Sequence, residues 1–215
     1  MNDTRIQTRT NYDRLSRWYD LIAGSSERTF ALRGLARLAL RPGERVLEIG
    51  AGTGALLAEL ARHVGPDGAA WGVDLSLGMC RVAHARLARA GMLSRAAPVC
   101  GDAVRLPCPA AAFDAIFMSF TLELFPDAEI AQVLAECRRV LRPDGRVGVV
   151  ALAQTGEPGL MSRLYAWAHR RFPAIVDCRP LPLAPILAEH GFRVTAVTAG
   201  SLWGLPVEIV LAASS

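Results

Sequence analysis

Residues 46–54 read VLEIGAGTG, and this stretch decides the fold that we expect for the chain. An apolar strand carries an acid, Glu48, near its end, and glycines at alternate positions follow at once. Gly50, Gly52 and Gly54 remove side chains where the backbone has to turn sharply and approach a ligand closely. A helical pattern begins directly after the last glycine. The order of strand, glycine loop and helix predicts a nucleoside-bearing ligand that lies against the loop.

The sequence around this stretch alternates between short apolar strands and helices. The strands are predicted over residues 45–50, 69–75, 97–100, 113–120 and 146–152. The helices are predicted over residues 27–40, 55–64, 77–91 and 127–141. Such alternation predicts an α/β fold with a parallel sheet that is covered on both faces. We therefore expect the ligand beyond the carboxyl ends of the first strands, where the strand order reverses.

The pattern changes after residue 152. Further helices are predicted over 158–171 and 183–191, and further strands over 192–199 and 206–213. The last two strands flank the segment 200–204, which predicts a closing antiparallel hairpin. A chain of 215 residues fits one domain with a sizeable core.

Composition limits the classes of function. The chain is 52% apolar, yet no run reaches the roughly 18 apolar residues of a membrane span. The first twenty residues are polar and carry no signal-peptide core, so we expect a cytoplasmic protein. The net charge of +4 is spread along the chain, which gives no reason to expect nucleic acid and leaves open a peripheral contact with an anionic membrane surface.

Two residue types exclude several kinds of chemistry. All 24 basic residues are arginine, and without lysine the chain has no Walker A loop, no Schiff base and no Tyr-x-x-x-Lys pair. The five cysteines are scattered without a CxxC motif. We therefore expect no metal site and no disulfide framework, and we interpret the cysteines as buried or half-buried thiols rather than as redox residues.

Three acids lie at or just after the carboxyl ends of the first three strands. Glu48 can hold polar groups at the glycine loop or attract an ammonium group, and its alternative is a solvated acid at a strand end. Asp74 can accept hydrogen bonds from both hydroxyls of a ribose, although Asp74 or Ser76 can also cap the next helix. Asp102 can accept from the exocyclic amino group of adenine, or it can stabilise a turn.

These motifs together resemble the class I S-adenosylmethionine-dependent methyltransferases. The resemblance rests on VLEIGAGTG, on VDLS (73–76) and on GDAVRLPCPAAAFDAIF (101–117), and it runs from Arg45 to Leu152. It implies a Rossmann-like, doubly wound, mainly parallel seven-stranded sheet with an antiparallel C-terminal strand. Within the family, the Tyr19-Asp20 pair and RVLRPDGRV (139–147) are similar to ubiquinone/menaquinone C-methyltransferases and to short bacterial phospholipid N-methyltransferases.

The chain departs from the quinone enzymes after the fourth strand. Those enzymes usually carry an Arg-Asn pair there, whereas this chain reads SFTLELF, with Glu123 where many relatives have histidine. Glu123 is therefore a candidate polar group near the acceptor, and its alternative is an acid that faces water. His169 is the candidate general base, with a structural histidine as its alternative.

The resemblance implies S-adenosyl-L-methionine as the cofactor and a role for each matching residue. Gly50, Ala51 and Gly52 would approach the methionine portion and the ribose, with Glu48 beside them. The other implied cofactor contacts are Asp74 to the ribose, Leu75 against the adenine, Asp102 and Ala103 at the adenine edge, Ser119 at the sulfonium end, and Tyr19 as a cover. An aromatic anchor for the N-terminal helix is the alternative for Tyr19.

The expected domain therefore consists of four parts: an N-terminal helical cap (1–40), a cofactor-binding core (45–152), an acceptor-site insert (153–182), and a closing helix and hairpin (183–215). The insert is rich in aromatic residues and arginine, which suits a small, apolar, aromatic or lipid-like acceptor or a packing face. Two other functions stay open. An NAD-dependent oxidoreductase could use the GAGTGA loop (50–55), and an inactive scaffold protein could retain the cofactor site.

Overall fold

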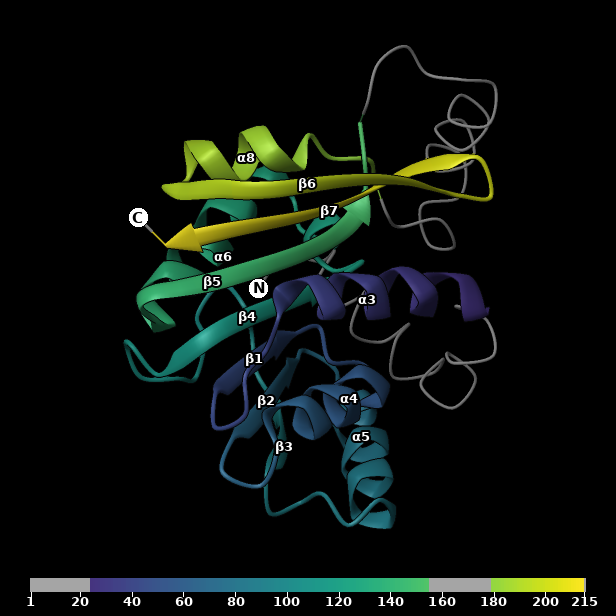
Figure 1. The fold of residues 1–215 in the computed structure, drawn as a ribbon, viewed down its shortest axis with the longest axis vertical. Coiled ribbons are helices and arrows are strands. Elements are labelled where there is room, and N and C mark those ends of the chain that lie inside the picture. Colours follow the sequence, from purple (N-terminus) through teal and green to yellow (C-terminus); the bar gives the residue numbers. More distant parts are fainter. Residues whose placement is uncertain (1–23, 155–178, 215) are drawn as a thin grey trace.

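Seven strands form one sheet in the computed structural model, which describes residues 24–154 and 179–214 (Figure 1). The strands are β1 (Arg45–Ile49), β2 (Ala69–Asp74), β3 (Ala96–Cys100), β4 (Phe113–Ser119), β5 (Leu141–Leu152), β6 (Phe192–Leu202) and β7 (Leu205–Ser214). Their order in the sheet is β3-β2-β1-β4-β5-β7-β6. Among these strands β7 alone runs opposite to the other six, so its pairings with β5 and β6 are antiparallel and all other pairings are parallel, which confirms the expected mixed sheet.

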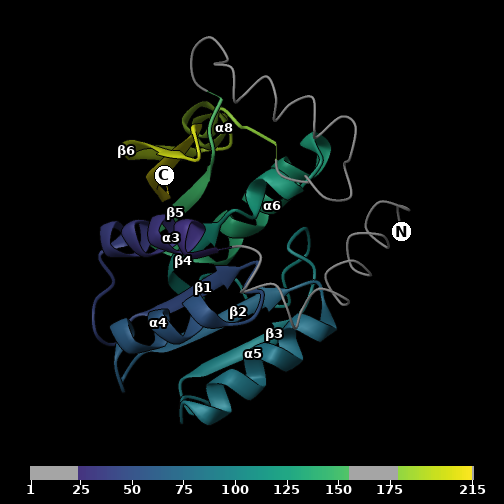
Figure 2. The same cartoon turned by 90° about the vertical axis from the view of Figure 1, so that its right-hand side faces the viewer.

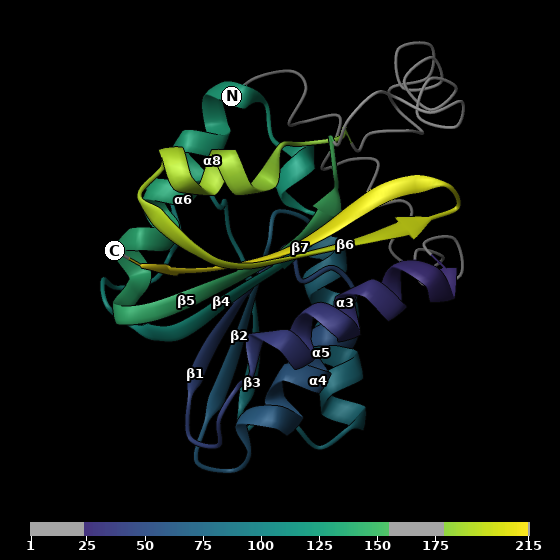
Figure 3. The ribbon, with the colours of Figure 1, turned by 45° about the horizontal axis from the view of Figure 1, so that its top comes forward.

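Helices cover both faces of this sheet. On one face lie α3 (Gly24–Leu38), α4 (Ala55–Val64) and α5 (Leu77–Arg89), and on the other lie α6 (Asp127–Val140) and α8 (Leu183–Glu189) (Figures 2 and 3). Each face has its own apolar core, because successive side chains of a strand point to opposite faces. A short 3-10 helix, η1 (Leu122–Leu124), follows β4 and was not predicted.

The strand order reverses between β1 and β4. The chain moves outward from β1 through β2 to β3 and then returns to the other side of β1 to form β4. The connections that follow β1 and β4 therefore leave in opposite directions, and a crevice opens beyond their carboxyl ends. Residues predicted from three separate motifs meet at this place.

Two predicted boundaries were wrong for local reasons. Strand β5 begins at Leu141 instead of residue 146, because Leu141 already pairs with Phe113 and the ladder resumes at Arg146 after an irregularity. The final hairpin turns within two residues, Trp203 and Gly204, whose φ angles are 52° and 82°. Two positive φ values match the twist of the flanking strands, so β6 and β7 extend further than predicted.

Arg146 on β5 ties the sheet to the end of α3. Its guanidinium donates to the carbonyls of Leu38 (2.7 Å) and Ala39 (2.9 Å) and to both carboxylate oxygens of Glu44 (2.9 and 2.7 Å). Burial alone would raise the pKa of Glu44, but the hydrogen bonds from Arg146 and from the Arg41 backbone lower it below its ordinary value. The charged pair therefore favours the folded state at neutral pH.

We expect Arg146→Ala to lower the free energy of unfolding by about 2 kcal/mol at pH 7, because charge-assisted hydrogen bonds are lost. The contribution of Glu44 is present above its ordinary pKa of 4.5 and disappears as pH falls through the lowered value in the folded state. The difference between wild type and variant should thus shrink below pH 4.5 in urea denaturation. Arg193→Ala, at an exposed site on β6, is the control, and an equal loss there would contradict the assignment.

Candidate functional site

The glycine loop after β1 is shaped by its neighbours. Gly50 has a φ of 77°, and a Cβ added there would collide with the side chain of Thr121, which follows β4. Gly52 has a φ of 51°, but a Cβ there would meet nothing within 4 Å. Glycine at position 50 thus lets two strand ends approach one another, whereas position 52 leaves open space in front of the loop.

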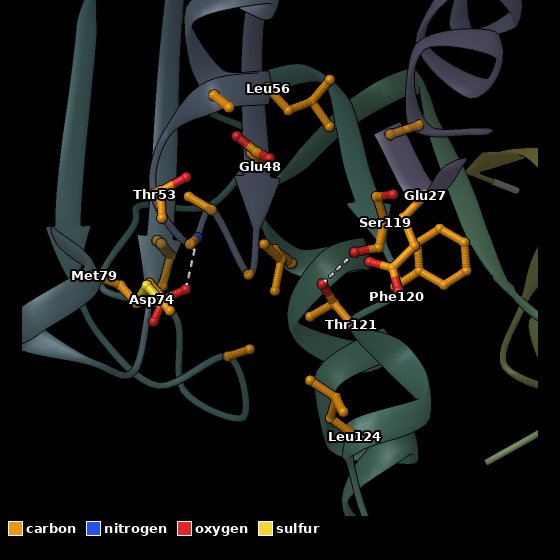
Figure 4. Close-up of a pocket in the computed structure, with 18 of the residues that line it drawn as sticks. Glu27, Glu48, Thr53, Leu56, Asp74, Met79, Ser119, Phe120, Thr121 and Leu124 are labelled. Atoms are coloured by element: carbon orange, nitrogen blue, oxygen red, sulfur yellow. Dashed lines mark hydrogen bonds between the residues drawn. The ribbon is translucent and has the colours of Figure 1, made fainter. Parts of the chain in front are cut away.

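A cavity of about 980 Å³ lies in front of this loop, at the carboxyl ends of β1, β2 and β4 (Figure 4). This volume is at the upper end of the range for small-molecule sites. Residues from all three predicted motifs line it: Glu48, Gly50, Ala51, Gly52, Asp74, Leu75, Asp102, Ala103 and Ser119. Of the other predicted site residues, Tyr19 and His169 lie outside the described residues.

Asp74 holds the glycine loop in place. One carboxylate oxygen accepts from the backbone N–H of Gly52 at 2.8 Å, and the other accepts from the N–H of Ser76 at 2.9 Å. Ser76, and not Asp74, caps α5, since its hydroxyl oxygen accepts from the N–H of Met79. A carboxylate has about four acceptor positions, so Asp74 can bind further hydroxyl groups from the cavity.

Asp102 also combines a local contact with a place on the cavity wall. Its carboxylate accepts from the N–H of Val104 at 3.1 Å, and its carbonyl accepts from the N–H of Arg105 at 3.1 Å. These bonds form a turn, as the alternative interpretation of Asp102 predicted. The same turn presents Gly101, Asp102 and Ala103 to the cavity, next to the end of β2.

Glu48 is the most unusual of the three acids. It is 4% exposed, and its Oε2 has no hydrogen-bond partner among the described residues. Burial, and to a smaller extent the negative charge of Asp74, raises the pKa of Glu48 well above its ordinary 4.5. The alternative of a solvated strand-end acid was therefore wrong. A cation or hydrogen-bond donor in the cavity would supply the missing partner.

The segment after β4 forms the opposite wall. Phe120 adopts a φ of 50°, and its N–H donates to the carbonyl of Val150 at 2.7 Å. The hydroxyl of Thr121 donates to the carbonyl of Ser119 at 3.0 Å. A left-handed phenylalanine is strained, and such residues often occur at functional sites. We did not predict Phe120 or Thr121, because their role depends on β1 lying beside them.

Glu123 does not face water, so that interpretation was wrong. It is 1% exposed and does not belong to the cavity wall. Its Oε1 accepts from the N–H of Leu152, the last residue of β5, at 3.2 Å. The geometry gives Glu123 a structural contact with β5, and its predicted catalytic role stays a prediction.

One residue of the cavity wall was missed, and one arginine of the predicted insert contacts a residue of that wall. Glu27, in the first turn of α3, lines the cavity close to Ser119 and Phe120 (Figure 4). Arg179 donates to the carbonyl of Phe125, a cavity residue, at 3.0 Å and pairs with Asp127 at 2.6 Å. Glu27 belongs to no sequence motif, so the sequence offers no signal for it, whereas Arg179 is one of the arginines of the predicted acceptor-site insert.

The acids determine what the cavity can bind. Glu48, Asp74 and Asp102 favour a ligand with positive charge and hydroxyl or amino donors, and they would repel the pyrophosphate of a dinucleotide. Within the described ranges, no group of three His, Cys, Asp or Glu side chains could hold a metal ion. The arrangement therefore suits a cationic nucleoside.

Residues 46–145 match the family described as "Methyltransferase domain". The ubiquinone/menaquinone biosynthesis C-methyltransferase UbiE of Ralstonia nicotianae is 39% identical over 140 residues, which cover 65% of this chain and 56% of that protein. The protein of the same name from Paraburkholderia xenovorans is 36% identical over 180 residues, which cover 84% of this chain and 66% of the relative. These matches support a class I S-adenosylmethionine-dependent methyltransferase that resembles UbiE.

A solved methyltransferase structure has the same fold as this chain over nearly its whole length. The 1,6-didemethyltoxoflavin-N1-methyltransferase of Burkholderia thailandensis was solved with 1,6-didemethyltoxoflavin and S-adenosylhomocysteine. It matches with a TM-score of 0.73 at 20% identity and covers 98% of this chain and 88% of that one. The likeness concerns the fold, and the expected cofactor class agrees with the family.

The family assignment does not favour the oxidoreductase and scaffold alternatives. This methyltransferase spans 56% of the length of the first UbiE relatives, so their substrates do not transfer directly. No helix in the part of the chain that the structure describes is long and apolar enough to cross a membrane.

Proposed function

We propose that the protein transfers a methyl group from S-adenosylmethionine to a small acceptor that is apolar, aromatic or lipid-like. The acidic cavity carries this proposal. Glu48 is buried and its Oε2 has no hydrogen-bond partner among the described residues, which suits a cationic ligand, and the three acids would repel a pyrophosphate. The names of the relatives support a small-molecule acceptor, since one group is named for ubiquinone/menaquinone biosynthesis and another protein is a 1,6-didemethyltoxoflavin-N1-methyltransferase.

The cavity residues fit the cofactor. S-adenosylmethionine, when bound, supplies a methyl group on a sulfonium whose leaving group is already activated. We assign Glu48 to the positively charged methionine end and Asp74 to the ribose hydroxyls. Leu75 would pack against the adenine, and Asp102 would accept from its amino group. The glycine loop leaves space for close approach at Gly52, where a Cβ would meet nothing.

The wall formed after β4 would position the acceptor. Phe120, Leu124 and Phe125 give this side of the cavity apolar surface, and Ser119 lies at the end of the strand between them and the glycine loop. An in-line displacement mainly requires alignment of donor and nucleophile and exclusion of water, which these residues can provide. A dedicated base is needed only where the nucleophile carries a proton. His169 in that role and Tyr19 as a cover stay predictions.

We propose the four-part division of the domain given above, with residues 153–182 contributing to the acceptor site. The described ends of this segment support it, because Leu181 pairs with Leu152 and Arg179 contacts the cavity residue Phe125. We also propose a cytoplasmic location, since the four described cysteines are all free thiols, as expected in a reducing compartment. The net charge of +4 supports peripheral contact with an anionic membrane.

Isothermal calorimetry tests the proposed cofactor. The purified full-length chain should bind S-adenosylmethionine and S-adenosylhomocysteine but not NADH. Binding of NADH without binding of either sulfur compound would overturn the proposal. The acceptor can then be sought by mass spectrometry of a cell extract that has been incubated with the protein and an isotopically labelled methyl donor.

We expect Glu48→Gln to weaken binding of S-adenosylmethionine about tenfold, because a charge-assisted contact becomes a neutral one. The same substitution should stabilise the ligand-free protein at pH 8. The raised pKa of Glu48 means that ionising this buried acid costs stability as pH rises through its value in the folded state.

Calorimetry and thermal unfolding at pH 5 and pH 8 measure the two effects of Glu48→Gln. The stability of the wild type relative to the variant should fall between these pH values. Unchanged affinity in a folded variant would show that Glu48 does not contact the cofactor. Glu44→Gln, directly before the amino-terminal end of β1 and outside the cavity wall, is the matched control for binding.

A further inference from the structure

Two cysteine thiols lie together directly behind the end of β2. Cys100 is the last residue of β3 and sits beside Asp74 in the β2–β3 register, while Cys80 lies in the first turns of α5. The Cys80 thiol contacts the carbonyl of Asp74 at 3.7 Å, and the Cys100 thiol contacts the carbonyl of Leu75 at 3.7 Å. The two thiols thus contact the carbonyls of consecutive residues, Asp74 and Leu75. The end of β3 and the start of α5 therefore place two thiols beside the end of β2.

The two thiols differ in accessibility. Cys100 is exposed, whereas Cys80 is 7% exposed. Burial, and then the negative charge of Asp74, raises the pKa of the Cys80 thiol to about 12. An oxidant from solution will therefore meet Cys100 first, because exposure and thiolate formation control cysteine reactivity. Cys80 is held next to the sulfur that has reacted and can serve as the second thiol.

We propose that Cys80 and Cys100 form a peroxide-sensitive modification site that closes to a disulfide and weakens cofactor binding. In the first step, the Cys100 thiol loses its proton to solvent and the thiolate attacks a peroxide oxygen. The O–O bond breaks, Cys100 becomes a sulfenic acid, and the leaving hydroxide takes up a proton from solvent as water. In the second step, the Cys80 sulfur attacks that sulfur, the S–O bond breaks, and the leaving hydroxide takes the Cys80 proton as water. Hydrogen peroxide thus accepts two electrons, and a dithiol reductant returns them.

The disulfide would act on the cofactor site through β2. The sulfurs contact the carbonyls of Asp74, the last residue of β2, and of Leu75, which follows it, and both of these residues line the cavity. A disulfide removes both thiol donors and draws the end of β3 toward α5, since two bonded sulfurs lie about 2.05 Å apart. We expect the disulfide to lower the affinity for the cofactor about fivefold, which is the lower end of typical coupling between two sites. This part rests on the proposed function, whereas disulfide formation does not.

Peptide mapping tests the modification itself. Fully reduced full-length protein is treated with hydrogen peroxide, alkylated and digested, and the peptides are identified by mass spectrometry. We expect a Cys80–Cys100 cross-link that dithiothreitol reverses and that is absent in Cys100→Ser and in Cys80→Ser. Cys108→Ser, at a half-exposed thiol elsewhere, should still form it. Over-oxidised Cys100 without a cross-link, or a cross-link that uses another cysteine, would overturn the proposal.

Calorimetry with S-adenosylhomocysteine tests the coupling. Oxidised wild type should bind S-adenosylhomocysteine about fivefold more weakly than reduced wild type. The affinity of Cys100→Ser should be the same before and after treatment with peroxide. Because coupling is reciprocal, bound S-adenosylhomocysteine should also reduce the yield of cross-link. Equal affinities of the two forms would overturn the coupling. Absence of binding in both forms would contradict the proposed function instead, and the mapped cross-link would still decide whether the dithiol reacts.

Discussion

Replacing Asp74 by alanine is expected to weaken binding of S-adenosylmethionine by about 1–3 kcal/mol, roughly 5- to 150-fold. The substitution removes the acceptor that holds the Gly52 N–H at 2.8 Å, and it removes the proposed acceptor for the ribose hydroxyls. Both losses act on the same ligand site, because the glycine loop and Asp74 line one cavity. Calorimetric Kd values for wild type and variant measure the effect.

Two further variants separate binding from local stability. Asp74→Asn retains the size of the side chain but replaces one acceptor oxygen by a donor, so it should lose most of the same affinity. Ser76→Ala removes the cap of α5 and should cost about 1 kcal/mol of stability without a comparable loss of binding. If Asp74→Ala folds and binds normally, or if Ser76→Ala weakens binding equally, the ribose assignment of Asp74 is wrong.

Replacing Gly52 by valine is expected to reduce cofactor affinity by more than about 100-fold, since a side chain would fill the space that the ligand needs. No atom lies within 4 Å of the position of an added Cβ, so the free protein has room for the side chain. The φ of 51° is strained for valine and should cost about 1–2 kcal/mol of stability.

Gly43→Val is the matched control for this backbone strain. Gly43 has a φ of 86°, its Cβ would also meet nothing within 4 Å, and it lies in the turn before β1, outside the cavity wall. We expect both variants to lose similar stability in thermal unfolding, while only Gly52→Val loses the cofactor. Normal binding by Gly52→Val would mean that the ligand does not approach this loop.

The fold was predictable because its signals are local. Each strand of the parallel core is a short apolar run, and most predicted ends lie within two residues of the observed ends. The glycine loop, Asp74 and Asp102 were recognisable because each lies at or just after the carboxyl end of a strand. Parallel strands then bring such positions to one edge of a sheet, whatever the details of packing.

The remaining features of the site depend on tertiary contacts. Thr121 explains Gly50 only when β4 lies beside β1, and the contact of Asp74 with Gly52 joins residues 22 positions apart. The burial of Glu48 depends on which helices cover its face of the sheet, which a strand of five residues does not reveal. Arg179 reaches the cavity rim through Phe125, 54 residues earlier in the chain.

The place of β7 inside the sheet has a consequence for biosynthesis. Residues Leu205–Ser214 lie between β5 and β6, so β5 keeps an unpaired apolar edge until this late segment has left the ribosome. Until then strands β1 to β5 of the nascent protein must stay together without the pairing of β6 and β7 to the sheet. A premature stop before residue 205 would therefore remove a strand from inside the sheet instead of an edge strand. Strand β6 and helix α8 would then be separated from the rest of the domain. Such a product would expose a row of backbone donors and acceptors that favours aggregation and degradation.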